Sequence, residues 1–333
     1  MTSATSPAGQ IGLLIYPDCQ LAAIHGLTDL FRIASEWAAR GAEGRNAPFV
    51  RVTHWTASED KGTVTCTWDS HPGAEHRLTH VIAPPSIVMP DRMRPMPAAA
   101  AWMKARHSDG STLASVCAGA FVLAETGLID GRRATTHWAF AAQLAARFPE
   151  VELAEARMIL DDGDVMTAGG ILAWTDLGLS LVERLLGPSV MLATARFLLV
   201  DPPRLSQKPF AQFLPRFDHG DAAVRRVQHQ VHARPADAPS VKELAELAGL
   251  SERTFLRRFG KATGFRPVAY LQQVRMAKAR EALELSNAPV DTIAWSVGYA
   301  DPAAFRKIFQ RITGLSPGTY RRRFGIAEST RVS

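Results

Sequence analysis

Cysteine is scarce in this sequence. The three cysteines among 333 residues, Cys19, Cys66 and Cys117, lie far apart along the chain. An odd number of widely spaced cysteines excludes a disulfide scaffold and a zinc site of the CxxC type, so no metal site is expected. Few cysteines fit a reducing compartment, and a cytoplasmic location is therefore expected.

Long apolar runs are also missing. No stretch reaches the ~20 apolar residues that a membrane-spanning helix requires, so a membrane is not an expected partner. Residues 1–10 lack a basic segment followed by an apolar one, so no secretory signal is expected. With 47% apolar and 21% charged residues, the composition is that of an ordinary globular protein, and the length predicts two domains.

Acidic residues are few in the last third of the chain. Residues 225–333 contain 19 Lys and Arg but 9 Asp and Glu, a net charge of +10. Residues 1–224 contain 19 basic and 23 acidic residues, a net charge of −4. A compact basic domain beside an acidic one favours a nucleic-acid-binding module, although charge alone leaves a solvated basic surface as an equal alternative.

The first two thirds of the chain alternate strand-like and helix-like segments. Residues 11–16 form a continuous apolar run, and residues 80–83 and 112–116 are also strand-like, which predicts a parallel sheet covered on both faces. Residues 158–160 and 165–167 flank an Asp- and Gly-containing turn and predict a hairpin. Further strands are expected at 49–56 and 64–68, and helices at 24–39, 98–106, 118–126, 139–147, 173–186 and 190–199.

The remainder of the chain shows no strand signal. Residues 201–221 carry four prolines and predict a linker. Beyond it, residues 241–259 and 290–309 resemble each other: each has a short helix, a glycine turn and a second helix. Residues 267–285 predict one long helix between them. The matched positions are Gly249 and Gly298 in the turns, Ser251 and Asp301 at the helix starts, and Phe255, Phe259, Phe305 and Phe309 on the apolar faces.

Two helix–turn–helix units in a basic domain predict a tandem DNA reader, whereas a structural helical bundle is the disfavoured alternative. Ser240 and Glu243 predict a capping box, and Pro302 suits the first turn of its helix. Leu256 and the phenylalanines are expected to face the core. The candidate DNA-binding residues are Glu252, Arg253, Thr254, Arg257 and Arg258 on the first reading helix, and Ala303, Arg306, Lys307 and Gln310 on the second.

Residues 225–325 resemble the AraC/XylS-type DNA-binding domain. The stretches that carry the resemblance are AELAGLSERTFLRRF, GFRPVAYLQQVRMAKAREAL and IAWSVGYADPAAFRKIFQRITGLSPGTYRRRF. The resemblance implies a bacterial transcriptional regulator, most often an activator, with promoter DNA and RNA polymerase as partners. It also implies a homodimer, for which the helices within 177–199 are candidate interface elements.

Cys117 lies between a predicted strand and a predicted helix. This context fits a nucleophile elbow, in which a sharp turn presents one side chain above the sheet. The helix N-terminus is expected to favour the thiolate, and His137 could act as its base. The structural alternative, a small buried cysteine and an unrelated polar histidine, is favoured by the pattern alone.

Residues 11–190 resemble the ThiJ/PfpI-like branch of the class I glutamine amidotransferase-like fold. The stretches that carry the resemblance are IGLLIYPDCQLAAIHGLTDLF, SVCAGAFVLAETGLIDGRRATTHW and VMTAGGILAWTDLGL. The arrangement as a whole resembles GlxA-type regulators. The expected fold is a flavodoxin-like parallel sheet sandwiched by helices over 9–200, then the linker, then an all-α domain with two helix–turn–helix units over 222–326.

Two departures from enzymes of that fold argue against catalysis. Ala22 and Ala23 stand where a carboxylate is usual, and Pro84 and Pro85 remove backbone N–H groups from the expected oxyanion loop. A sensor that binds a small effector, amino-acid-like or a quaternary amine, is therefore expected, without a cofactor. The candidate ligand-binding residues are Pro17, His25, Pro84, Ser86, Cys117, Ala118, His137, Trp138, Gly169 and Gly170.

Two other functions stay open for this domain. One is a cysteine-dependent hydrolase or hydratase that uses Cys117 and His137 and is fused to the DNA-binding domain. The other is a redox sensor, which ranks last because no resolving cysteine is near in the sequence. Trp138 could face a cationic ligand through a cation–π contact, whereas core packing is favoured for Trp174.

Overall fold

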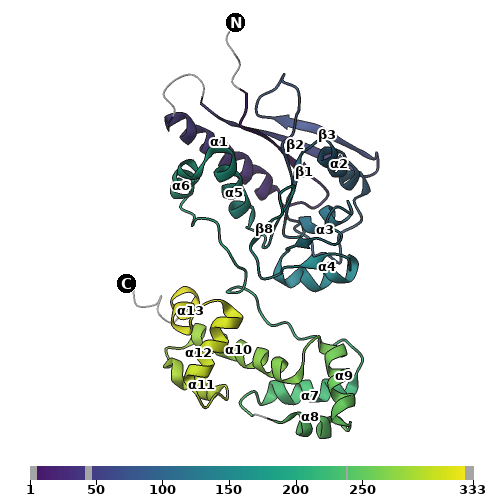
Figure 1. The fold of residues 1–333 in the computed structure, drawn as a ribbon, viewed down its shortest axis with the longest axis vertical. Helices are drawn as coiled ribbons and strands as arrows, with labels where there is room; N and C mark the ends of the chain where they lie inside the picture. Colours follow the sequence, from purple (N-terminus) through teal and green to yellow (C-terminus); the bar gives the residue numbers. More distant parts are fainter. Residues whose placement is uncertain (1–5, 42–46, 238, 327–333) are drawn as a thin grey trace. The chain divides into compact units, whose positions relative to one another are not determined.

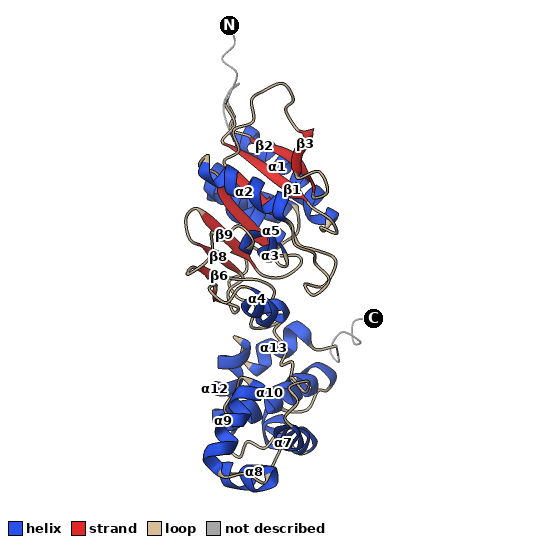
Figure 2. Ribbon diagram, turned by 90° about the vertical axis from the view of Figure 1, so that its right-hand side faces the viewer, coloured by secondary structure: helices blue, strands red, loops and turns tan. Residues whose placement is uncertain are grey.

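The computed structural model describes residues 6–41, 47–237 and 239–326. The chain divides into two compact units, Met1–Gln207 and Lys208–Ser333. All the strands belong to the first unit, and the described part of the second unit is helical (Figures 1 and 2). Among the described residues, none of the helices has the length and apolar character needed to cross a membrane.

The first unit is built on a mostly parallel sheet with the strand order β3-β2-β1-β4-β5-β9-β8. The five inner strands β2, β1, β4, β5 and β9 run parallel, and the edge strands β3 and β8 are antiparallel to their neighbours. The strands are β1 (Gly9–Ile15), β2 (Val50–Ser58), β3 (Thr63–Asp69), β4 (His80–Ala83), β5 (Thr112–Val116), β8 (Ile159–Asp161) and β9 (Val165–Ala168).

The strand predictions are confirmed, including the hairpin of β8 and β9. A separate pair of two-residue strands, β6 (Arg133–Ala134) and β7 (Glu152–Leu153), was not predicted. Strands this short carry no periodicity that a sequence pattern could reveal. They matter for the site, because they lead into the loops that follow residues 134 and 153.

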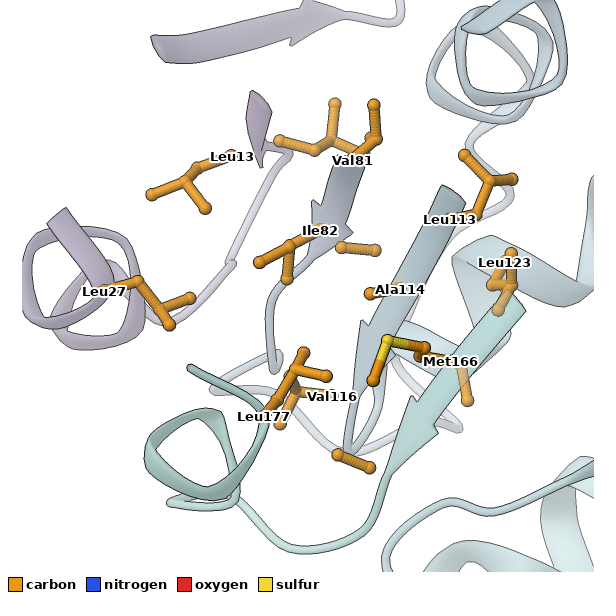
Figure 3. Packing of buried hydrophobic residues seen from close by; sticks show 14 of the residues in the cluster. Leu13, Leu27, Val81, Ile82, Leu113, Ala114, Val116, Leu123, Met166 and Leu177 are labelled. Carbon is orange, nitrogen blue, oxygen red and sulfur yellow. The ribbon is translucent and has the colours of Figure 1, made fainter. Parts of the chain in front are cut away.

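Helices cover both faces of the sheet (Figure 1). Helices α1, α5 and α6 pack together on one face, and α2 and α3 pack on the other. Leu13, Ile82 and Val116 point from the strands toward Leu27 of α1 and Leu177 of α5 (Figure 3). The helices are α1 (Leu21–Gly41), α2 (Pro97–Ser108), α3 (Gly119–Ala124), the 3₁₀ turn η1 (Trp138–Phe140), α4 (Ala141–Arg147), α5 (Trp174–Leu186) and α6 (Pro188–Phe197).

The second unit has two small cores joined by one long helix. Phe255 and Phe259 are buried in the first core, and Phe305 and Phe309 are buried in the second. Helix α10 contributes residues to both cores, which confirms the predicted tandem arrangement. The helices are α7 (Ala222–Ala233), α8 (Val241–Ala248), α9 (Glu252–Thr263), α10 (Pro267–Leu285), α11 (Val290–Ser296), α12 (Pro302–Thr313) and α13 (Pro317–Phe324).

The segment predicted as a linker, residues 201–221, is shared between the two units. Residues up to Gln207 belong to the first unit. Within the second unit, the ring of Phe213 packs against Phe265 and Tyr270 at 5.7 and 5.1 Å between centroids. The guanidinium of Arg280 donates to the backbone oxygen of Lys208 at 3.1 Å. The middle of the proline-rich segment is therefore held within the second unit.

Candidate functional site

The first helix–turn–helix unit begins with the predicted capping box. The backbone N–H of Glu243 donates to Ser240 Oγ at 3.2 Å, and the backbone N–H of Ser240 donates to Glu243 Oε2 at 2.7 Å. Gly249 ends α8 with φ of 69°, the left-handed conformation that favours glycine. Ser251 then caps α9 by accepting from the N–H of Thr254. The predicted capping box, glycine turn and helix start are thus all confirmed at the expected residues.

The second helix–turn–helix unit repeats this construction between α11 and α12. Gly298 has φ of 86°, and a Cβ there would lie 2.4 Å from the backbone oxygen of Ala236, so only glycine fits the turn. The carboxylate of Asp301 accepts from the N–H groups of Ala303 and Ala304 at 2.8 and 3.1 Å. Both reading helices, α9 and α12, are therefore anchored at their N-terminal ends.

Helix α9 exposes part of the predicted set. Glu252, Arg253 and Arg257 are exposed, and Thr254 is half-buried. In the described part of the chain, neither Arg253 nor Arg257 forms an ion pair, so their guanidinium groups are available to a ligand. The prediction that Leu256 faces the core is wrong, because this side chain is 42% exposed.

Arg258 has a different role from the predicted one. Its Nε and Nη2 atoms donate to the two carboxylate oxygens of Asp221 at 2.8 and 2.7 Å. Asp221 is also the N-cap of α7 and accepts from the N–H of Val224. Arg258 therefore fastens α9 to α7, and its guanidinium is committed within the fold. The acceptor lies 37 residues away, so no local pattern signals the pair.

Helix α12 exposes Ala303, Arg306, Lys307 and Gln310, all four of the predicted residues. Arg306 forms an ion pair with Asp291 of α11, and both side chains are about half exposed. An exposed pair of this kind is weak, so Arg306 can exchange its partner for a phosphate or a base at small cost. The two reading helices thus present different side chains on similar scaffolds.

Cys117 sits on a strained turn at the carboxyl end of β5. Its φ is 54°, an uncommon conformation for a residue other than glycine. Its backbone N–H donates to the oxygen of Ala168 at 2.7 Å, and its backbone oxygen accepts from Thr136 Oγ1 at 2.7 Å. A Cβ on Gly119 would lie 2.4 Å from the oxygen of Ala83, so the turn needs glycine there. The geometry is that of the predicted elbow.

The thiol of Cys117 is not poised to react. The residue is 1% exposed, and burial raises the pKa of its thiol to about 12. The expectation that the helix N-terminus favours the thiolate is therefore wrong, because desolvation of the charged form outweighs the dipole of a helix of six residues. At neutral pH the thiol is uncharged.

His137 does not supply a base for that thiol. Its Nδ1 accepts from the N–H of Ala139 at 3.1 Å, which caps the turn η1. Its ring packs against Trp138 and Phe140 at 5.3 and 4.9 Å between centroids. Within the described residues, no hydrogen bond joins it to Cys117. Burial lowers the pKa of His137, so the ring is neutral at pH 7.

The other predicted ligand-binding residues divide by exposure. Pro84, Ser86, Ala118 and Gly169 are buried, Pro17 and His25 are exposed, and Trp138 and Gly170 are half-buried. The ring of Trp174 packs against Gly26, where a Cβ would lie 2.4 Å from it, in line with the predicted structural role.

Sequence reasoning missed two residues at this edge of the sheet. The hydroxyl of Tyr16 is buried and donates to the backbone oxygen of Pro84 at 2.5 Å. The side chain of Gln207 enters between the loops that follow β6 and β7 and accepts from the N–H of Trp138 at 3.1 Å. Gln207 lies in the segment predicted as a linker, and nothing in the local pattern distinguishes it from a surface residue.

Comparison with known proteins finds two families in this chain. Residues 244–323 match a helix-turn-helix domain, and residues 57–184 match the DJ-1/PfpI family. The HTH-type transcriptional regulator GlxA of Rhizobium meliloti is 32% identical over 65% of this chain and 67% of that protein. The regulator CdhR of Pseudomonas aeruginosa is 26% identical over 66% of each chain.

Solved structures resemble each unit separately. Drosophila melanogaster DJ-1beta covers 58% of this chain and 98% of its own at 18% identity and a TM-score of 0.44. The DNA-binding domain of AdpA, in complex with a target DNA, covers 33% of this chain and 96% of its own at 33% identity and a TM-score of 0.31. The curated relatives are transcriptional regulators, which agrees with the prediction that this chain is not an enzyme.

Proposed function

Because this chain belongs to the family of AraC-type helix-turn-helix transcriptional regulators that carry a DJ-1/PfpI domain, we propose that it activates transcription in response to a small effector. The chain spans about two thirds of the length of the relatives named above. Promoter DNA, RNA polymerase and a second copy of the chain are the partners in this proposal. Contact with promoter DNA makes the cytoplasm its place of action.

Helices α9 and α12 enter adjacent major grooves of the promoter. The 19 residues of α10 support this reading, because a helix of that length is about 28 Å long, close to the ~34 Å between successive major grooves. Arg253 and Arg257 on α9, and Arg306, Lys307 and Gln310 on α12, carry donors suited to guanine, adenine and phosphate.

The effector binds at the carboxyl edge of the sheet, beside the elbow of Cys117. The observation that carries this proposal is the elbow itself, in which Cys117 has φ of 54° and is 1% exposed. Burial raises the pKa of the thiol, so the turn is kept without its nucleophile. A site that binds without reacting suits a sensor. His25, His137, Trp138 and Gly170 retain enough exposure to meet a ligand. An amino-acid-like or quaternary-amine effector can meet the ring of Trp138 through its cation.

The homodimer in this proposal uses α5 and α6. Leu192 and Phe197 on α6 are exposed, and Phe197 is 60% exposed, so this helix offers apolar side chains that a second copy of the chain can cover. Analytical ultracentrifugation of the full chain and of Phe197→Ser tests this part. A wild-type protein that sediments as a monomer at micromolar concentration contradicts it.

The experiment that tests the proposal combines DNA binding with effector response. The full chain selects its DNA site from a random library, and its affinity is then measured by fluorescence anisotropy with amino acids, betaines and polyamines. Cys117→Ala is expected to respond to the same effector as the wild type. Loss of the response in Cys117→Ala, together with chemical turnover of the effector by the wild type, supports the cysteine-dependent enzyme instead.

A further inference from the structure

The carboxamide of Gln207 occupies a polar cage in the first unit. The residue is 2% exposed, although it lies in a proline-rich segment near the end of that unit. Its Oε1 accepts from the backbone N–H of Trp138 at 3.1 Å. Its Nε2 faces four oxygens: Thr135 Oγ1 at 3.2 Å and the backbone oxygens of Thr136, Glu155 and Arg157 at 2.8, 3.0 and 2.9 Å.

The cage is richer in acceptors than a carboxamide can satisfy. An amide nitrogen carries two hydrogens, so the carboxamide itself makes a well-directed hydrogen bond to at most two of the four oxygens. The hydroxyl of Thr135 donates to one of them, the backbone oxygen of Arg157, at 3.0 Å. The reverse orientation of the amide would turn its oxygen toward four oxygens, which settles which end is the nitrogen. A primary ammonium offers three hydrogens and a guanidinium five, each with a positive charge that strengthens every bond. The cage therefore suits a cationic nitrogen better than its present occupant.

The cage shares residues with the proposed effector site. Thr136 supplies one cage oxygen, and its hydroxyl donates to the backbone oxygen of Cys117 at 2.7 Å. The backbone N–H of Trp138 supplies the donor that Gln207 Oε1 meets. Gly169 closes the wall: a Cβ there would lie 1.9 Å from Gln207 Nε2, so any larger residue expels the carboxamide. A ligand that reaches the elbow is thus next to the cage.

Residues 204–207, here named the latch, are held by further bonds within the first unit. Arg204 makes a bidentate ion pair with the buried carboxylate of Asp176. The N–H of Met158 donates to the oxygen of Leu205 at 3.2 Å, and the N–H of Gln207 donates to the oxygen of Ala156 at 3.0 Å. The next residue, Lys208, begins the DNA-binding unit. Release of the latch therefore frees the chain immediately before that unit.

We propose that Gln207 is an internal ligand of a cation subsite, and that an effector with a primary ammonium or guanidinium group displaces it and releases the latch. This inference rests on the proposed function, because it assigns one end of the effector and the route by which its binding reaches the second unit. An effector whose nitrogen carries no hydrogen can donate no hydrogen bond to the four oxygens. Within the effector classes considered above, the cage thus selects for ammonium over quaternary amine.

The latch is tested by hydrogen exchange in the full chain. In Gln207→Ala and in Gly169→Ala, the backbone amides of Met158 and of position 207 are expected to exchange at least about tenfold faster than in the wild type, because the latch opens. Gln143→Ala, an exposed glutamine on α4, serves as the matched control and is expected to exchange as the wild type does. Wild-type protection of the Met158 amide in both cage variants overturns the proposal.

The subsite is tested with propylguanidinium and propylammonium, against tetramethylammonium at equal ionic strength. Propylguanidinium is expected to speed exchange in the latch of the wild type while protecting residues 134–138. In Gln207→Ala the carboxamide that competes for the cage is gone, so the half-saturating concentration of propylguanidinium is expected to fall at least about tenfold. Equal affinities in the two proteins, or equal effects of tetramethylammonium, overturn the subsite.

The sensing function and the latch can fail separately. If an effector changes DNA binding but Gln207→Ala responds with wild-type affinity, the proposed function stands and the latch is wrong. If propylguanidinium displaces the latch and no effector changes DNA binding, the cage is right and the sensing function is wrong. Gly169→Ala keeps the test informative should Gln207→Ala unfold, because it expels the side chain without removing it.

Discussion

The two helix–turn–helix units of this regulator are repeats 50 positions apart that agree in their scaffold and differ at their surface. Phe255, Phe259, Thr263, Pro267 and Tyr270 recur as Phe305, Phe309, Thr313, Pro317 and Tyr320. Thr263 and Thr313 even make the same bond, each donating at 2.8 Å to the backbone oxygen four residues earlier.

Most of the exposed positions do not repeat. Arg253 corresponds to Ala303 and Leu256 to Arg306, whereas Arg257 and Lys307 are both basic. The half-buried, ion-paired Arg258 corresponds to Ile308. The core positions are thus shared, and most of the positions free to meet DNA have diverged. Two readers with one scaffold can therefore recognise two different half-sites. Among the predicted DNA-binding arginines with an exposed side chain, Arg253 and Arg257 have no ion-pair partner in the described residues, whereas Arg306 has one.

The largest expected effects come from the shared core, and they are expected to be equal. Phe259→Ala and Phe309→Ala each remove a buried ring. Each is expected to lower the free energy of unfolding by about 3–5 kcal/mol in its own half of the second unit, where a half is one helix–turn–helix with its small core. Urea denaturation combined with hydrogen exchange measures the loss in each half. A loss below about 1 kcal/mol in one half shows that the two cores are not equivalent.

The next effect separates the two surfaces. Arg253→Ala is expected to weaken binding to the selected DNA site by about 1–3 kcal/mol, because a guanidinium that reads a base is lost. Arg306→Ala is expected to weaken binding by less, because in the absence of DNA Arg306 is paired with Asp291 and must give up this ion pair to bind DNA. Fluorescence anisotropy at fixed salt measures both. Arg94→Ala, an exposed arginine of the first unit outside the proposed dimer helices, controls for the change in net charge; a loss as large as that of Arg253→Ala in this control refutes a role in reading.

Substitutions at the N-caps test whether both reading helices are stabilised by the side chain that caps them. Ser251→Ala and Asp301→Ala are each expected to destabilise their helix by about 1 kcal/mol. The loss at Asp301 is expected to be the greater, because its carboxylate accepts from two N–H groups and also meets the positive end of the helix dipole. Thermal unfolding measures both losses, and a neutral Asp301→Ala contradicts the account.

The smallest effect is a difference in acid sensitivity. The hydrogen bond with Arg258 lowers the pKa of Asp221 to about 2, below the ~3.9 of an unfolded Asp. The pair stabilises the fold above that unfolded value, and its contribution is lost as the pH falls from about 4 to 2. The second half has Ile308 at the position that matches Arg258, so it has no such ion pair to lose at low pH. Hydrogen exchange in each half at pH 5 and pH 3 tests it, and Asp221→Asn is expected to abolish the difference.

The features that local chemistry determines could be predicted from the sequence. The apolar run of β1, the capping box of Ser240 and Glu243, and the glycine turns at Gly249 and Gly298 all depend on residues within one turn of each other. The elbow at Cys117 follows in the same way, from a strand that ends beside a run of small residues.

The features that depend on distant partners could not be predicted. Arg258 finds Asp221 across 37 positions, and Gln207 finds Thr135 across 72. The 1% exposure of Cys117 agrees with the buried cysteine that the pattern favoured. The pKa of its thiol depends on how deeply the finished fold buries it, and no local pattern gives that depth. Leu256 sits at a position whose exposure is set by the neighbouring helices and not by the periodicity of α9.

The most direct test of the account is a hydroxyl-radical footprint of the full chain and of Arg253→Ala on the selected DNA site. We expect two protected patches about 10 base pairs apart, one for each reading helix. Arg253→Ala is expected to lose protection in one patch and to keep the other. A single patch shorter than one helical turn, or equal weakening of both patches in the variant, would contradict a tandem reader with separate half-sites.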